Sequence, residues 1–178
     1  MKAAVARLLE HLDPDPHREG LADTPRRMAE ALLELTQGTY QDPLALLGDG
    51  FEEVCDEMVV VKDIAFVSLC EHHVMPFHGH VTIAYIPTGR VVGLSKLARL
   101  TECFARRLQM QERMTNQIAD ALVEKLAPEG VGVMVKGFHS CMAFRGIRNG
   151  GTTITSALRG ALRDKGDARA EFMALAQG

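Results

Sequence analysis

The fold of this protein is decided by a stretch in the middle of the chain, EMVVVKDIAFVSLCEHHVMPFHGHVTIAYIP, which runs from Glu57 to Pro87. Both ends of the stretch are rich in β-branched residues, which favour strands. We therefore expect one or two strands ending at Cys70 and another over residues 80–87, with Pro76 forcing a turn between them. The stretch also holds four of the seven histidines in the chain, close to the end of the first strand.

Helical patterns lie on both sides of this stretch. Before it, DTPRRMAEALLELTQG, from Asp23 to Gly38, has a capping residue, a proline in the first turn and a terminating glycine. After it, residues 95–108 and 113–126 carry apolar side chains three or four positions apart, which predicts two long helices. The remaining expected elements are an N-terminal helix, two strands and a closing helix, over residues 5–12, 130–146, 150–158 and 167–176.

This order of elements predicts an α+β fold with an antiparallel sheet. With 178 residues, of which 47% are hydrophobic, the chain can bury a sizeable core in one domain. The formal net charge of −3 leaves no excess of positive charge to bind a nucleic-acid backbone. No apolar run is long enough to span a membrane, and the N-terminus is unlike a secretory signal. We expect a cytoplasmic protein with reduced cysteines and no nucleic-acid or membrane partner.

Five side chains that bind metals well fall at the ends of two predicted strands. Cys70, His72 and His73 follow the first strand, and His139 and Cys141 follow another strand much further along the chain. If these strand ends are neighbours, thiolates and imidazoles meet in a small volume, and zinc binds such a set well. The spacing leaves open which histidine binds, and whether the site has three protein ligands and a water or four ligands in a closed structural site.

The other cysteines and histidines have ordinary structural explanations. A single cysteine is usually a small core residue, and strand histidines seldom have a role in a site. We therefore expect only structural roles, and no role in a site, for Cys55, Cys103, His11, His17, His78 and His80.

Positive charge is grouped at the start of a predicted helix. Ser95, Lys96 and Arg99 lie in its first turns, where backbone amides favour anions, and Arg145 closely follows Cys141. This grouping suggests a phosphorylated substrate, although a solvated helix face and a surface arginine would give the same pattern. A polar segment, QMQER, joins the two long helices and by itself reads as a connection.

These stretches together resemble the GTP cyclohydrolase I family over nearly the whole chain. The order CEHH, GLSK, QxQER and HxCMxxRG is a highly specific combination. The matching stretches are REGLADTPRRMAEAL, DEMVVVKDIAFVSLCEHHVMPFHGHVTIAYIP, GLSKLARL, RRLQMQERMTNQIADAL and HSCM followed by RGI.

The resemblance implies the tunnelling fold (T-fold), in which an antiparallel sheet backed by two long helices assembles into pentameric barrels. Two barrels stack as a homodecamer with active sites between subunits. Residues 1–45 would form an N-terminal helical segment and residues 46–178 the catalytic T-fold core of a single functional domain. The implied reaction is hydrolysis of GTP to formate and 7,8-dihydroneopterin triphosphate, at the start of folate and tetrahydropterin synthesis.

The resemblance also implies roles for individual residues. Zn²⁺ would be bound by Cys70, His73 and Cys141 with water in the fourth place, and His72 and His139 would transfer protons. Gln111 and Glu112 would read the guanine edge. Contacts to ribose and triphosphate would come from Ser95, Lys96, Arg99, Arg145 and Arg27.

One position departs from the family pattern. Members commonly carry a lysine at the end of the TPxRxAK stretch, whereas this chain has Glu30, whose carboxylate would repel phosphates. Arg27 fits the pattern and is expected to serve instead. Because the chain begins close to this helix, we also expect no long regulatory extension before it.

Two other readings follow from the same residues. The same fold could serve another pterin or deazapurine reaction, such as that of a nitrile reductase, although that relative uses an isolated cysteine and lacks CEHH. Alternatively, the metal could be purely structural, which would leave the protein inert toward GTP.

Overall fold

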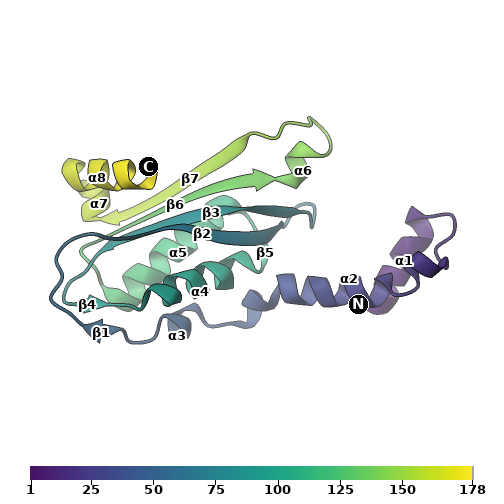
Figure 1. The fold of residues 1–178 in the computed structure, drawn as a ribbon, viewed down its shortest axis with the longest axis horizontal. Coiled ribbons are helices and arrows are strands. Elements are labelled where there is room, and N and C mark those ends of the chain that lie inside the picture. Colours follow the sequence, from purple (N-terminus) through teal and green to yellow (C-terminus); the bar gives the residue numbers. More distant parts are fainter. Residues whose placement is uncertain (178) are drawn as a thin grey trace.

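Four long antiparallel strands form the sheet in the computed structural model, which describes residues 1–177 (Figure 1). They are β2 (Val59–Cys70), β3 (Pro76–Ile86), β6 (Gly130–His139) and β7 (Thr152–Gly160), adjacent in that order. A short strand, β5 (Leu108–Gln109), pairs with the end of β2 in the parallel direction. The α+β prediction is confirmed, but the expected antiparallel sheet is in fact mixed because of this fifth strand.

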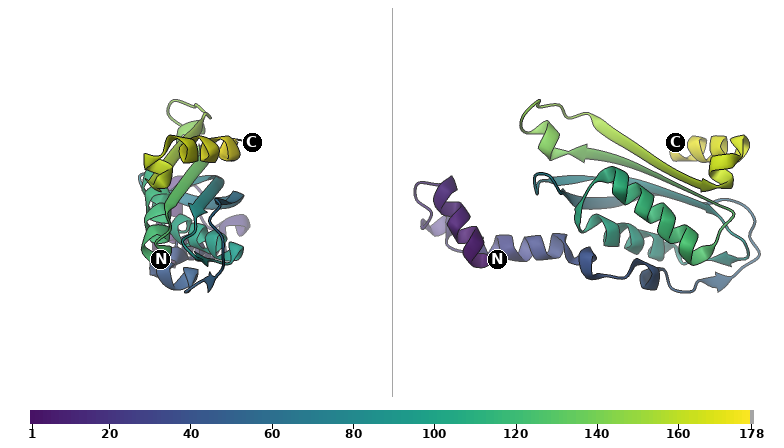
Figure 2. Two further views of the ribbon diagram at one scale, coloured as in Figure 1. Left: turned by 90° about the vertical axis from the view of Figure 1, so that its left-hand side faces the viewer. Right: turned by 180° about the vertical axis from the view of Figure 1, so that it is seen from behind.

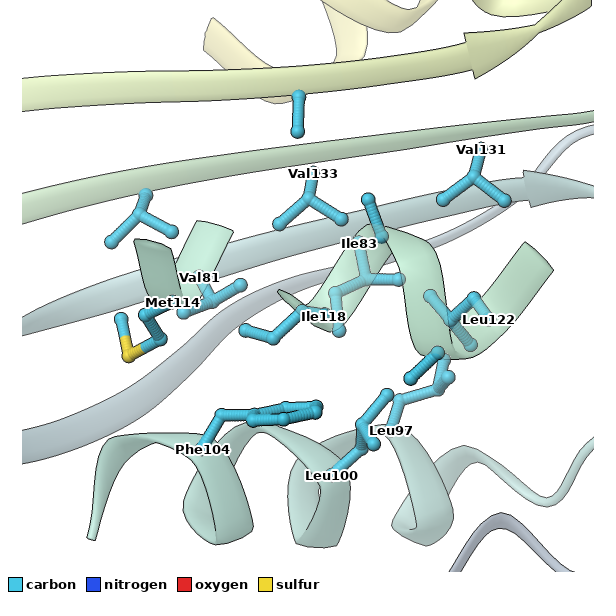
Figure 3. Packing of buried hydrophobic residues seen from close by; sticks show 14 of the residues in the cluster. Val81, Ile83, Leu97, Leu100, Phe104, Met114, Ile118, Leu122, Val131 and Val133 are labelled. Atoms are coloured by element: carbon cyan, nitrogen blue, oxygen red, sulfur yellow. The ribbon is translucent and has the colours of Figure 1, made fainter. Parts of the chain in front are cut away.

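Two helices cover one face of the sheet, as their apolar spacing predicted. They are α4 (Leu94–Ala105) and α5 (Gln111–Leu126), which lie side by side under the strands (Figures 1 and 2). Side chains along β3 and β6 alternate between the two faces of the sheet. The apolar ones on one face meet apolar side chains of the two helices (Figure 3). Burying each large apolar side chain stabilises the fold by about 1.5–3 kcal/mol. The labelled contacts are Val81, Ile83, Leu97, Leu100, Phe104, Met114, Ile118, Leu122, Val131 and Val133.

The turn between β2 and β3 differs from the expected one. Pro76 does not make the turn but begins β3, four residues before the predicted start, and pairs with Leu69. A proline is tolerated at the first position of a strand. The turn is made by the residues before it: the Val74 amide donates to the Cys70 carbonyl at 2.8 Å, and Val74 has a φ of 54°. This tight hairpin places CEHH at one end of the sheet.

The N-terminal helices form an arm that projects from the sheet (Figure 1). It consists of α1 (Lys2–Leu12) and α2 (Thr24–Leu35), and a short α3 (Pro43–Leu47) leads back to the body. The predicted helix is confirmed, although Asp23 binds Arg26 and Arg27 rather than capping the helix with its side chain. A division of function at residues 45 and 46 stays a prediction.

Smaller elements complete the described chain, among them two 3₁₀ helices, η1 (Glu19–Leu21) and η2 (Gln37–Tyr40). Two residues each of β1 (Phe51–Glu52) and β4 (Arg90–Val91) pair with one another. Helix α6 (Ser140–Ala143) follows β6, and α7 (Ala161–Asp164) leads to the predicted closing helix, α8 (Gly166–Gln177). Phe172 of α8 packs on the opposite face of the sheet from α4 and α5. No helix within residues 1–177 combines the length and apolar character that a membrane crossing requires.

Candidate metal centre and substrate cavity

Three predicted metal ligands come together at the end of the sheet. Cys70 is the last residue of β2, His73 lies in the turn after it, and Cys141 lies in α6, immediately after β6. Because β6 pairs with β3, with His139 opposite Phe77, the distant Cys141 reaches the same end of the sheet as Cys70. One ligand atom from each of the three residues lies within 4.8 Å of the others, and Cys70 Sγ is 3.7 Å from His73 Nδ1.

The chemistry of this trio suits a zinc ion. Two sulfurs and one imidazole form a donor set that zinc prefers. Burial raises the pKa of the Cys141 thiol, and the adjacent Cys70 raises it further. Two neighbouring thiolates are therefore unfavourable without a cation between them, and a bound divalent metal would remove this penalty by holding both in the deprotonated form.

The three ligands border a cavity of about 250 Å³. Glu112, at the start of α5, and both remaining histidines of the predicted site also line it. Sequence reasoning did not predict a site role for five further lining residues, namely Phe77, Gln109, Met110, Met142 and Thr153. Gln109 and Met110 belong to the motif QMQER and Met142 belongs to HSCM, so the motifs contained these residues without indicating a role for them. Phe77 and Thr153 are ordinary strand residues by pattern.

The two remaining histidines occupy different environments. His72 lies in the exposed turn, with its Nδ1 3.9 Å from Cys70 Sγ. His139 is half-buried, and its ring stacks on Phe77 with a centroid distance of 4.6 Å and an interplanar angle of 6°. Burial lowers the pKa of His139, while the carboxylate of Glu112 opposes this shift. The His139 ring is therefore biased toward the neutral form.

The sequence of the segment QMQER suggested a simple connection between helices, but in the structure the segment has further contacts. Gln109 belongs to β5, and Gln111 begins α5. Glu112 is exposed at the cavity, whereas Gln111 is 2% exposed and is hydrogen-bonded to His139. Arg113 donates two hydrogen bonds to Glu71, at 2.5 and 3.0 Å. Consecutive residues of this segment therefore contact different parts of the site.

Most of the expected phosphate-binding residues do not join this cavity within one chain. Ser95, Lys96 and Arg99 lie at the start of α4, near β4, at the end of the molecule opposite α6 (Figure 1). Arg145 is exposed just after α6, close enough to lower the pKa of the Cys141 thiol. The cavity of a single chain therefore brings together the predicted metal ligands and the two histidines predicted to transfer protons, without the α4 cations.

The departure on α2 also has a local explanation. Glu30 accepts a hydrogen bond from Arg26 at 2.9 Å, and Arg27 lies 3.4 Å from Asp23. Arg27 and Glu30 are both exposed on the projecting arm, whose helices are shown in Figure 1. The negative charge of Glu30 is thus partly neutralised by Arg26 of the same helix.

Comparison with known proteins identifies close relatives. The chain is 51% identical to "GTP cyclohydrolase 1" of Dehalococcoides mccartyi, over 99% of this chain and 95% of that protein. It is 49% identical to "GTP cyclohydrolase 1" of Wolinella succinogenes, over 97% and 94%, and 51% identical to that of Mycobacterium leprae, over 98% and 86%.

A solved structure and a family comparison complete this picture. The crystal structure of the archaeosine synthase QueF-Like in the apo form matches with a TM-score of 0.50 and 19% identity, covering 58% of this chain and 93% of that one. This similarity shows the fold alone and is consistent with the expected T-fold. The model of the family described as GTP cyclohydrolase I matches residues 1–177, so the chain belongs to the GTP cyclohydrolase I family.

Proposed function

We propose that this chain catalyses the reaction of its family, the hydrolysis of GTP to formate and 7,8-dihydroneopterin triphosphate. The observation that best supports this is the meeting of Cys70, His73 and Cys141 beside His139 and Glu112 in one cavity. This arrangement combines a metal-binding trio, a proton-transfer group and a carboxylate. The product would enter folate or tetrahydropterin synthesis.

The three-residue donor set supports a catalytic rather than a structural metal. Structural zinc sites are almost always closed by four protein ligands, whereas catalytic sites leave one position for water. Within the described residues only Cys70, His73 and Cys141 have ligand atoms mutually within reach of one ion. Bound zinc would supply a nucleophile at neutral pH by lowering the pKa of water from about 15.7 to about 7.

The chain's own side chains would handle protons and orientation. Opening of the guanine imidazole ring needs water to attack C8 and a proton to reach N7. His139, biased toward the neutral form by burial, can take a proton from water and pass it to N7. His72, in the exposed turn, would exchange protons with solvent during the later steps.

Glu112 supplies a means of recognising guanine. Its carboxylate is an acceptor at the cavity wall, and guanine offers N1–H and the 2-amino group as two neighbouring donors. Charge-assisted hydrogen bonds of this kind are stronger than neutral ones. Adenine, which lacks both donors, would be rejected at this edge.

We further propose that a second subunit completes each site, within a homodecamer of two stacked pentamers. Ser95, Lys96 and Arg99 lie far from the cavity of their own chain, so these residues could reach a triphosphate bound there only from another copy. The sheet supports such assembly, because β7 is an edge strand and the outer side of β2 is paired only at its end. Unpaired strand edges are templates for further pairing.

The test is to incubate the purified protein with GTP and to follow formate release together with the fluorescent oxidised neopterin product. We expect both signals, their loss on chelation and their return when zinc is added. A zinc-loaded protein that releases no formate from GTP would overturn the proposed activity. The expected cytoplasmic location stays a prediction, which cell fractionation can test.

A further inference from the structure

We infer that Gln111 positions His139 rather than reading the substrate: its amide holds the imidazole as the tautomer protonated at Nε2, which leaves Nδ1 to exchange protons. The inference rests on the proposed function in one respect, namely that His139 transfers protons. The resemblance to the family instead placed Gln111 beside Glu112 as a guanine contact. The side-chain hydrogen bonds of Gln111 distinguish these two roles.

The orientation of the Gln111 amide follows from its neighbours. One end of the amide lies 3.2 Å from the Val135 carbonyl oxygen and 3.1 Å from the Thr153 carbonyl oxygen. Backbone carbonyls only accept hydrogen bonds, so this end must be the NH₂ group. Its third neighbour, Thr155 Oγ1, is also at 3.1 Å. Rotating the amide by half a turn would place its oxygen against two carbonyl oxygens.

Two threonines, the buried Thr115 and the partly buried Thr155, support the same orientation. Thr115 Oγ1 donates to the backbone carbonyl of Gln111 at 2.7 Å, which uses its single hydrogen. Thr155 Oγ1, 2.7 Å from Thr115 Oγ1, must then donate to it and keeps its own lone pair for the Gln111 amide. The hydroxyls and the amide therefore satisfy one another in a single direction.

The tautomer of His139 follows from this orientation. The opposite end of the amide, Gln111 Oε1, lies 2.9 Å from His139 Nε2. An amide oxygen is an acceptor, so Nε2 must carry a hydrogen. In a neutral imidazole the other nitrogen, Nδ1, then has the free lone pair. Nδ1 has no hydrogen-bond partner among residues 1–177, and the ring lines the cavity.

The surrounding backbone is shaped for this contact. Gly137 lies two residues before His139 on β6, and a Cβ added there would stand 2.3 Å from Gln111 Oε1 and 3.6 Å from His139 Nε2. Any other residue would therefore displace the amide oxygen from the ring. Phe77 holds the imidazole by stacking against its face. The ring is thus fixed both in its plane and along its edge.

The same contacts leave Gln111 no group for a ligand. Its NH₂ has three acceptors for two hydrogens, and its oxygen is occupied by His139. The side chain is almost fully buried. Binding guanine through this amide would require breaking hydrogen bonds that it already makes within the protein, which is unfavourable. Gln111 is therefore a positioning residue.

The direct test is nitrogen NMR of zinc-loaded protein labelled with ¹⁵N-histidine, at a mildly alkaline pH where the His139 imidazole is neutral. The signals of His139 are identified by their absence in His139→Gln. We expect a pyrrole-like shift for Nε2 and a pyridine-like shift for Nδ1. The opposite pair of shifts in the wild-type protein would overturn the inference without any variant being needed.

Two variants test the cause of the tautomer. Gln111→Met removes the amide, and Gly137→Ala keeps it but displaces its oxygen. In both, we expect His139 to become a mixture of tautomers and kcat to fall about 10- to 100-fold, as for groups that orient metal-ligating imidazoles. KM should change little. Gln117→Met is the matched control, since Gln117 lies on the same helix but bonds to Gln109 instead.

Each outcome separates this inference from the proposed function. A higher KM with an unchanged tautomer in Gln111→Met would show a substrate contact and overturn the positioning role. A tautomer lost equally in Gln117→Met would show a general effect on α5 and would also overturn it. A wild-type protein that has the expected tautomer but is inert toward GTP would contradict the proposed activity while leaving the Gln111 contact established.

Discussion

At the residue scale, the two histidines of the cavity have similar chemistry but different surroundings. His139 is stacked on Phe77 and bonded to Gln111, whereas His72 lies in an exposed turn. A half-buried ring that is fixed in position can deliver a proton to one atom of the substrate, whereas an exposed ring exchanges protons readily with solvent. The difference between the two roles therefore comes from burial and hydrogen bonding.

Substitution at Cys141 and at His139 separates metal binding from proton transfer. Cys141→Ala should lose both zinc and turnover, because only two of the three protein ligands remain to hold the ion. His139→Ala should keep zinc but lower kcat about 10²- to 10⁴-fold, the usual contribution of general acid–base catalysis. Zinc content is measured by atomic emission and turnover by formate release.

The exposed His80 on β3 provides the control for these two variants. His80→Ala should match the wild type in zinc content and rate. Full activity in His139→Ala would remove this residue from the mechanism, and retention of zinc at full occupancy in Cys141→Ala would contradict the ligand set.

At the scale of elements, a contact between α5 and the β2–β3 turn holds the loop that carries two of the proposed metal ligands, Cys70 and His73. Arg113, on the first turn of α5, donates two hydrogen bonds to Glu71, which lies between Cys70 and His72. Paired hydrogen bonds from a guanidinium fix a carboxylate in direction as well as in distance. The helix thus orients the backbone from which two of the three ligands project.

Removing this contact should weaken metal binding without unfolding the protein. We expect Arg113→Leu to lower zinc affinity about 10- to 100-fold, the range for groups that orient metal ligands. Affinity is measured by competition with a zinc-binding dye. If the pair acts as a unit, the double variant with Glu71→Leu should bind zinc no more weakly than Arg113→Leu alone.

The control for this prediction is Arg159→Leu. This change breaks an ion pair between Arg159, on β7, and Asp120, which lies on α5 but does not line the cavity. Its zinc affinity should equal that of the wild type. Equal losses in Arg113→Leu and Arg159→Leu would mean that the stability of α5, rather than the Glu71 contact, governs metal binding.

A second element-scale feature is the close approach of β3 and β6. Gly79 and Gly137 are opposite each other, and a Cβ at Gly79 would lie 1.9 Å from the Lys136 carbonyl oxygen. Gly79→Ala should therefore force the strands apart and destabilise the protein by about 1–3 kcal/mol, as overpacking does. Urea unfolding measures the change.

Gly20→Ala serves as the control for strand separation, because a Cβ at Gly20 meets no atom within 4 Å. Its unfolding midpoint should stay close to that of the wild type. A Gly79→Ala protein with an unchanged midpoint would show that the two strands can separate at no cost.

At the scale of the whole molecule, a single chain leaves several surfaces incomplete. The α1–α2 arm projects from the body and exposes Leu8, Leu12 and Leu33. Within residues 1–177, the outer edge of β7 is unpaired, and that of β2 is paired only at its end. Apolar side chains and free strand edges of this extent are features of protein interfaces. They support the proposed oligomer, in which α4 of one copy would approach the cavity of another.

Mixing two inactive variants tests whether sites are shared between subunits. Cys141→Ala lacks a metal ligand, and Arg99→Ala lacks a cation at the start of α4. If each cavity takes its α4 cations from a neighbour, mixed oligomers should recover part of the wild-type rate, because some cavities then combine two intact halves. The rate is measured after the two proteins are unfolded and refolded together.

Each variant refolded alone is the control and should remain inactive or strongly impaired. A mixture no more active than its components, in oligomers shown to be mixed by mass spectrometry, would contradict a shared site. A monomer by light scattering that turns over GTP would contradict the proposed assembly as a whole.

Local patterns in the sequence determined much of this protein. Helical spacing in residues 95–126 and β-branched runs around CEHH predicted the main elements, since these patterns report which face of each element is buried. Specific motifs identified the family. They also selected Cys70, His73 and Cys141, which the structure brings within reach of one ion.

Only the tertiary structure decided how these parts meet. The parallel pairing of β5, the start of β3 at Pro76 and the place of Gln111 at the head of α5 were missed, because each depends on contacts between distant segments. The same is true of Gln111 and His139, whose hydrogen bond joins a helix to a strand. The spacing of apolar residues in the sequence shows whether a segment is a helix or a strand. The orientation of the buried Gln111 amide, in contrast, is set by carbonyl groups that only folding brings around it.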